Sequence, residues 1–128
     1  MVSDNKLTAI GRKMGLFAVL LLPLLSGCVV RHGDFSVVSN KLVRLSELDL
    51  DQADRARGIV GEDKQHIVCI IPIGGVPTLE GAIDDALEKG AGDVVTDAVI
   101  SAWSWYIPYI YGQSGWAVKG DVVKTRRN

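Results

Sequence analysis

The sequence of 128 residues has only two cysteines and two histidines, and this scarcity restricts the chemistry that it can carry. Two cysteines cannot build the multi-bridge framework that stabilises many small secreted domains. No nucleophile elbow, HExxH sequence or Cys/His pair occurs. His32 and His66 lack a cluster of carboxylates beside them in the sequence. We therefore predict that the protein is not an enzyme.

An excess of positive charge is also absent, because 14 basic residues stand against 15 acidic ones. Without residues 1–27, which hold three basic residues and one acidic residue, the formal charge is −3. A chain of this charge has no basic field that would attract nucleic acid, so no nucleic-acid partner is predicted. Residues 126–128 are interpreted as a short basic tail at a solvated chain end.

Two loops resemble ion-binding loops only superficially. The acidic segment 49–54 has Ala53 where a calcium ligand should stand, and no glycine follows. Gly74 and Gly75 precede a helix, but the spacing and the lysine of a phosphate-binding loop are missing. Neither a metal site nor a cofactor site is therefore predicted.

No hydrophobic run is long enough to cross a membrane, which takes about 20 apolar residues. The longest such run, residues 15–25, is about half that length and reads GLFAVLLLPLL. Lys6, Arg12 and Lys13 precede it. A basic segment followed by a short apolar segment is typical of a signal peptide.

The end of this apolar run supplies the most specific motif of the chain, Leu25-Ser26-Gly27-Cys28. These four residues resemble the lipobox of bacterial lipoproteins. The resemblance implies cleavage between Gly27 and Cys28, a thioether-linked diacylglycerol on Cys28 and an acyl chain such as palmitate on its new amino group. Val29, where some lipoproteins carry aspartate, implies sorting to the outer membrane, facing the periplasm.

These motifs divide the chain into four parts. Residues 1–27 are predicted to be a cleaved signal peptide and residues 28–34 a lipidated tether. Residues 35–125 are predicted to form a single domain, followed by the tail at 126–128. If Cys28 carries lipid, Cys69 has no partner in the chain, and its apolar neighbours predict a small buried residue.

The hydrophobic pattern of the domain predicts four strands and one helix. The strands are expected over residues 35–43, 67–73, 94–106 and 116–124, with a polar loop at 45–61 and a turn region at 107–115. The run at 67–73 is apolar at nearly every position, which is typical of a strand buried on both faces. The alternation at 116–124 favours an edge or half-exposed strand.

The helix is predicted over residues 79–89. Its apolar residues recur at helical spacing and give one buried stripe: Leu79, Ala82, Ile83, Ala86 and Leu87. Thr78 is the expected N-cap and Gly90 the expected left-handed residue at the C-terminal end. The order β-β-α-β-β predicts an α+β fold, in which one face of a small antiparallel sheet is covered by one amphipathic helix.

A second resemblance rests on the glycines that flank this helix and on the stretch WYIPYIYG at residues 105–112. The domain is similar to a group of small α+β envelope lipoproteins of bacteria. The resemblance implies a fold and a location and implies no activity.

Two functions remain open. The first is a non-enzymatic structural or interaction component of the envelope, with membrane lipid and a second copy or an envelope protein as partners. The alternative is a module that binds a sugar or an apolar ligand through the aromatic stretch 103–111. Since one helix covers only one sheet face, we predict an interaction surface on the other, formed by Trp103, Trp105, Tyr109 and Tyr111.

Overall fold

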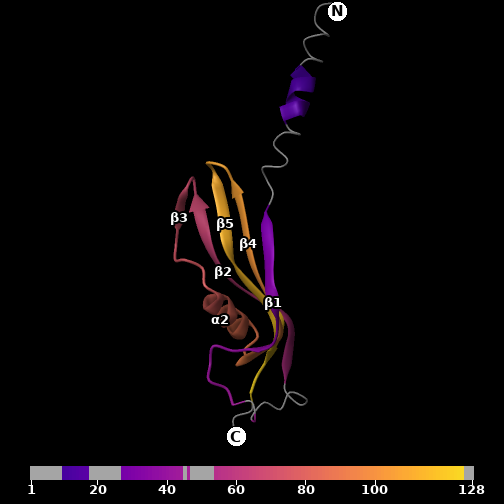
Figure 1. The fold of residues 1–128 in the computed structure, drawn as a ribbon, viewed down its shortest axis with the longest axis vertical. Helices are drawn as coiled ribbons and strands as arrows, with labels where there is room; N and C mark the ends of the chain where they lie inside the picture. The colour runs from indigo at the N-terminus through magenta and orange to yellow at the C-terminus, as the bar shows by residue number, and fades with distance from the viewer. Residues whose placement is uncertain (1–9, 18–26, 45, 47–53, 126–128) are drawn as a thin grey trace, which may run out of the picture.

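The structure is a computed structural model that describes residues 10–17, 27–44, 46 and 54–125. Residues 10–17 form a short helix. The remaining elements are β1 (Cys28–Val38), β2 (Arg55–Val68), β3 (Ile71–Ile73), α2 (Leu79–Lys89), β4 (Val94–Ile107) and β5 (Tyr111–Val123). Figure 1 shows a long, twisted sheet with α2 beside its lower half.

The five strands form one antiparallel sheet in the order β1-β4-β5-β2-β3. The α+β class is confirmed, but the sheet has five strands where four were predicted. The edge strands are β1 and β3, whereas β5 lies between β4 and β2. β5 was predicted to be an edge or a half-exposed strand, and the edge position was wrong. Its alternation of apolar and polar residues reflects the partial cover that the short helix gives to a long sheet.

The first strand begins earlier than predicted. Residues 28–34, expected as a tether, belong to β1, which pairs with β4 from Cys28 opposite Ser104 to Val38 opposite Val95. β1 ends at Val38, whereas the strand was predicted to continue to residue 43. The predicted loop at 45–61 is also shortened, since β2 already begins at Arg55. Residues 45 and 47–53 lie outside the described part of the chain.

The apolar run at 67–73 is not one buried strand. It contains the end of β2, a two-residue turn and the short edge strand β3, with Val68 paired to Ile71. Cys69 lies in this turn with φ 57° and is exposed, so the prediction that it is buried was wrong. The edge position of β3 suits Pro72, which has no amide hydrogen for a ladder.

β4 and β5 form a hairpin, and its turn is shorter than the turn region predicted at residues 107–115. Ile107 pairs with Tyr111, which leaves only residues 108–110 in the turn. Tyr109 takes a left-handed conformation there, with φ 62°. The strand β5 therefore includes residues 111–115, which were predicted to belong to the turn.

A bulge in β4 determines which residues face the helix. Asp97 has φ 51°, and the pairing with β5 shifts between Thr96 and Val99. Because one extra residue reverses the alternation, Val95 lies in the same core cluster as Ala98 and Ile100. Beyond the bulge, Trp103 and Trp105 have the opposite parity to Ile100, on the face away from α2.

The core lies between α2 and the half of the sheet nearest to it. The predicted stripe is confirmed, since four residues of α2 are buried: Ala82, Ile83, Ala86 and Leu87. They pack against β4 and β5 through Val95, Ala98, Ile100, Val118 and Val122. Gly61 of β2 brings the backbones together, because an added Cβ would lie 2.2 Å from the carbonyl oxygen of Ala82.

The C-terminal end of α2 differs from the prediction in one detail. Gly90 is the C-cap with a right-handed φ of −84°, and Ala91 is the left-handed residue, with φ 50°. The amide of Gly92 donates to the carbonyl of Leu87, and that of Ala91 to Glu88, which is a Schellman motif. Glycine at position 90 is instead required by packing, since an added Cβ would lie 2.3 Å from Cβ of Val122.

The N-terminal end of α2 provides a test of the helix assignment. The hydroxyl of Thr78 accepts from the amide of Gly81 at 3.0 Å, while Asp63 of β2 accepts from the amide of Thr78 at 2.8 Å. Removing the hydroxyl in Thr78→Ala is expected to lower the free energy of unfolding by about 1 kcal/mol. Urea unfolding followed by circular dichroism measures the change. Thr78→Ser keeps the cap, and an equal loss in both variants would contradict the capping role.

Candidate functional site

Cys28, the predicted lipid attachment residue, is the first residue of β1. It is exposed and lies opposite Ser104 of β4. Gly27 lies against β4 as well, since a Cβ there would be 3.3 Å from Cβ of Trp105. Leu25 and Ser26, the first half of the motif, lie outside the described residues. Cys28 is therefore joined to the folded sheet without a spacer.

A shallow pocket of about 290 Å³ lies beside Cys28. Its walls are mainly apolar and include Cys28, Val30, Pro77, Ala102, Trp103 and Trp116. Pro77 directly precedes the N-cap of α2, so the pocket occupies sheet surface that the helix does not cover. The ring of His32 lies 4.9 Å from that of Trp116, between centroids.

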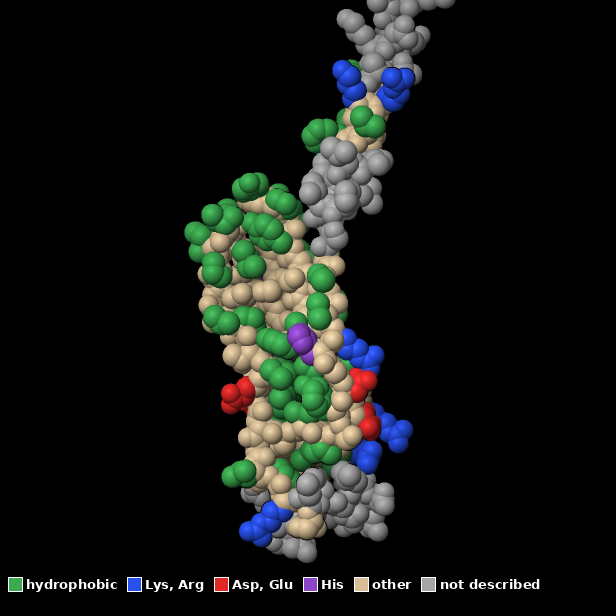
Figure 2. Space-filling view, viewed as in Figure 1, with side chains coloured by type: hydrophobic (Ala, Val, Ile, Leu, Met, Phe, Trp, Pro, Cys, Tyr) green, Lys and Arg blue, Asp and Glu red, His purple; other side chains and the backbone are tan. Residues whose placement is uncertain are grey.

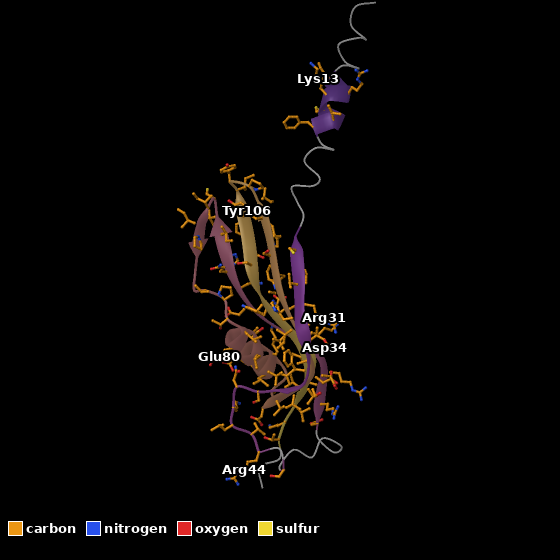
Figure 3. All side chains as sticks on the ribbon, viewed as in Figure 1. Lys13, Arg31, Asp34, Arg44, Glu80 and Tyr106 are labelled. Carbon is orange, nitrogen blue, oxygen red and sulfur yellow. The ribbon has the colours of Figure 1, made fainter. Side chains whose placement is uncertain are left out.

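Beyond Cys28, the sheet ends in two turns that are joined by hydrogen bonds. We call residues 68–71 and 108–110 the turn end. The hydroxyl of Tyr106 donates to the carbonyl of Cys69 and accepts from the amide of Tyr109 at 3.3 Å. The amide of Cys69 donates to the carbonyl of Ile110 at 3.0 Å. Figure 3 shows Tyr106 in the upper part of the sheet, near this end.

The turn end exposes large apolar side chains. Ile70 is 74% exposed, Ile71 64%, Tyr109 82% and Ile110 64%. No lysine, arginine, aspartate or glutamate occurs between Lys64 and Glu80 or between Asp97 and Lys119. In the view of Figure 2, charged side chains of the sheet lie along its middle and lower parts, and hydrophobic side chains gather at its upper end.

The predicted aromatic surface is only partly brought together. Trp105 and Tyr111 meet edge to face, with ring centroids 5.5 Å apart. Trp103 shares the strand face of Trp105, and both indoles are half-buried. Tyr109 lies apart from them, in the exposed turn. The four residues are therefore spread over β4, the turn and β5 and do not form one flat exposed face.

The hydroxyl of Tyr111 also belongs to a polar cluster. It accepts from the side-chain Nε2 of Gln113 at 2.8 Å and contacts Nδ1 of His66. Gln113 also lies 3.2 Å from that nitrogen. His66 is thus held by neutral partners on the strand face away from α2.

The described residues contain no group of three or more His, Cys, Asp or Glu side chains arranged to hold a metal ion. The carboxylates with a shifted pKa lie at the other half of the sheet. Hydrogen bonds from Thr125 and Lys41 lower the pKa of Asp93, although burial opposes them. These contacts join the chain around the core, away from the turn end. Among the described helices, none is long and apolar enough to cross a membrane.

Comparisons of the chain with protein-family models, curated proteins and solved structures found no match.

Sequence reasoning missed the residues that distinguish this site. Ile70 and Ile71 were predicted to be buried, and Tyr106 was grouped with the other aromatic residues. The signal that could have indicated them is the absence of charge over both turn segments. Over residues 67–73 that absence was interpreted as burial, because apolar runs are most often buried.

Proposed function

We propose that this protein is a bacterial envelope lipoprotein, anchored by lipid on Cys28, with a small α+β domain that acts as a non-enzymatic structural or interaction component. The observation that carries the proposal is the exposed Cys28, which ends a lipobox-like motif and begins the edge strand β1. The acyl chains of a lipidated thiol must extend away from the domain without entering its core. An exposed residue on an edge strand meets that requirement.

Lipid on one residue is sufficient for anchoring. Each buried CH₂ group contributes about 0.8 kcal/mol, and one acyl chain gives only reversible binding. A diacylglycerol and an N-linked acyl chain on Cys28 together bring three chains. The location that we propose is the outer membrane, with the domain facing the periplasm. The partners are membrane lipid and an envelope protein or a second copy of the chain.

Replacement of Cys28 tests the proposal directly. Cells that express Cys28→Ala are expected to contain an unlipidated protein that does not label with fatty-acid analogues, because the only thioether site is lost. Cys69→Ala is the matched control, since it removes the other thiol and should label like the original chain. Labelling is followed on gels after growth with an alkyne fatty acid. Undiminished labelling of Cys28→Ala would show that the anchor is assigned to the wrong residue.

A further inference from the structure

We infer that the turn end of the sheet enters the lipid bilayer beside the anchor. The protein then binds the membrane through its own side chains as well as through its acyl chains. This inference rests on the proposed lipidation of Cys28. It adds a second membrane contact, formed by the two turns at residues 68–71 and 108–110.

The position of Cys28 in the sheet carries the first step. Cys28 pairs with Ser104, and β4 continues to Ile107 before it turns at residues 108–110. At about 3.3 Å per residue, the turn lies roughly 15 Å beyond the anchor along the strand direction. Lipid on Cys28 holds that residue at the level of the glycerol groups. Because no spacer separates Cys28 from β1, an upright sheet places its turns below the lipid surface.

The side chains of the turn end suit that surrounding. Ile70, Ile71 and Ile110 are exposed and apolar. The nearest charged residue on β2 is Lys64, four positions before Val68. Charged side chains are costly in hydrocarbon, whereas isoleucine side chains are favourable there. The residue composition of the turn end therefore suits a segment that enters lipid.

Several backbone groups of the two turns already have partners within the protein. Polar backbone groups must find partners within the protein when water is absent. The amides of Cys69, Tyr109 and Ile110 donate to Ile110, Tyr106 and Ile107, respectively. The carbonyl of Cys69 accepts from the hydroxyl of Tyr106. These three amides and this carbonyl therefore need no water as a partner.

The aromatic residues lie at the level of the anchor. Trp103 and Trp105 flank Ser104, the partner of Cys28, and Trp105 contacts Tyr111. Tryptophan and tyrosine are enriched where a protein crosses the boundary between lipid and water. With Cys28 at the glycerol groups, both indoles fall at that boundary.

A second copy of the chain is the competing occupant of the turn end. A stable protein interface uses about 20–30 residues on each side. The turn end is a projection built from two short turns, and it offers fewer. Its position beyond the lipid attachment residue also favours the membrane over a protein partner.

Cys69 provides a probe inside the turn end, because it is exposed and is the only free thiol once Cys28 carries lipid. The lipidated full chain is labelled there with a polarity-sensitive fluorophore and reconstituted in phosphatidylethanolamine and phosphatidylglycerol vesicles. We expect a blue-shifted emission that is quenched by lipids spin-labelled in the upper acyl chain. A label on Lys124→Cys in a Cys69→Ser chain, at the opposite end of the sheet, should report water and remain unquenched.

Charge substitutions connect the signal to the turn end. Ile70→Asp together with Ile110→Asp should abolish the blue shift and the quenching, while the acyl anchor keeps the protein on the vesicles. Leu42→Asp introduces the same charge at a fully exposed site outside the turn end and should change neither. A lipidated protein whose Cys69 label remains in water would overturn the inference and leave the proposed function standing. A blue shift without quenching by lipid would also overturn it, in favour of a second copy.

Mass spectrometry of the protein tests the lipidation of Cys28 separately from the membrane entry of the turn end. Absence of the acyl mass on Cys28 would refute the proposed function. The turn end is then judged from Cys28→Ala, labelled at Cys69 and mixed with the same vesicles. Quenching by spin-labelled lipid in that chain would support membrane entry without the anchor, and its absence would overturn the inference.

Discussion

Replacing Ala86 of α2 by aspartate is expected to lower the free energy of unfolding by about 3–5 kcal/mol, because it places an uncompensated charge in the core. Ala86 is fully buried, at 0% exposure, and packs among the residues that join α2 to the sheet. Since a domain is stable by only about 5–15 kcal/mol, a loss of this size removes a large part of its stability. Urea unfolding of the variant and the original chain measures the difference.

The pH dependence of this variant separates charge from volume. Burial raises the pKa of the new carboxyl group in the folded state above its value in the unfolded chain. The part of the loss that is due to the charge is therefore fully present at pH values above the folded-state pKa and disappears as the pH falls below the unfolded one, while the part that is due to volume remains. Ala86→Asn has nearly the same volume without a titrating group, so its loss should not follow this change.

A control on the solvent side of α2 completes the comparison. Glu88 is exposed, and Glu88→Ala should change the free energy of unfolding by less than about 0.5 kcal/mol. Equal losses in Ala86→Asp and Glu88→Ala would show that the buried face of the helix is assigned wrongly.

The helix that carries Ala86 could be predicted because its signals are local. Its apolar spacing and its N-cap at Thr78 lie within residues 78–89, and the structure confirms both. The contacts on the other side of the helix are not all local. Asp85 accepts hydrogen bonds from the amide of Glu62 of β2 at 2.8 Å and from Lys89. Burial raises its pKa, but these hydrogen bonds outweigh burial and lower it.

The faces of the sheet could be predicted only in part. Strict alternation assigns Val95 to the face of Val99 and Trp103, whereas the bulge at Asp97 moves it to the core with Ala98. A bulge changes no residue type in the pattern, so the sequence of β4 alone does not show it. The same limit applies to residues 67–73, since an apolar run looks alike whether it is buried in a sheet or exposed at a turn.

The candidate site combines one local signal with one that is not local. The motif that ends at Cys28 is contiguous and could be found without a structure. The turn end is held together by a hydrogen bond from Tyr106 to Cys69, which lie 37 residues apart in the chain, and it depends on the strand order. No spacing rule relates these two segments, so their meeting beyond Cys28 became visible only in the folded sheet.

Gly61 of β2 is a second residue whose importance depends on the fold, and Gly61→Ala is expected to cost about 3 kcal/mol, the upper part of the usual range for overpacking. An added Cβ would lie 2.2 Å from the carbonyl oxygen of Ala82 and 2.4 Å from the amide nitrogen of Ala86. Both atoms belong to the backbone of α2, so no side-chain rotation can relieve the contact. The helix would have to move away from the sheet and separate the core residues on both sides.

Gly75→Ala is the matched control for this substitution. The residue has no atom within 4 Å of an added Cβ, and its φ is not in the left-handed region. Both variants reduce the flexibility of the unfolded chain equally, so the difference between them reports contact in the folded state. We expect Gly75→Ala to lie within about 0.5 kcal/mol of the original chain in urea unfolding. If Gly61→Ala were equally mild, α2 would have to lie farther from β2 than the structure places it, and the core described above would have to be packed differently.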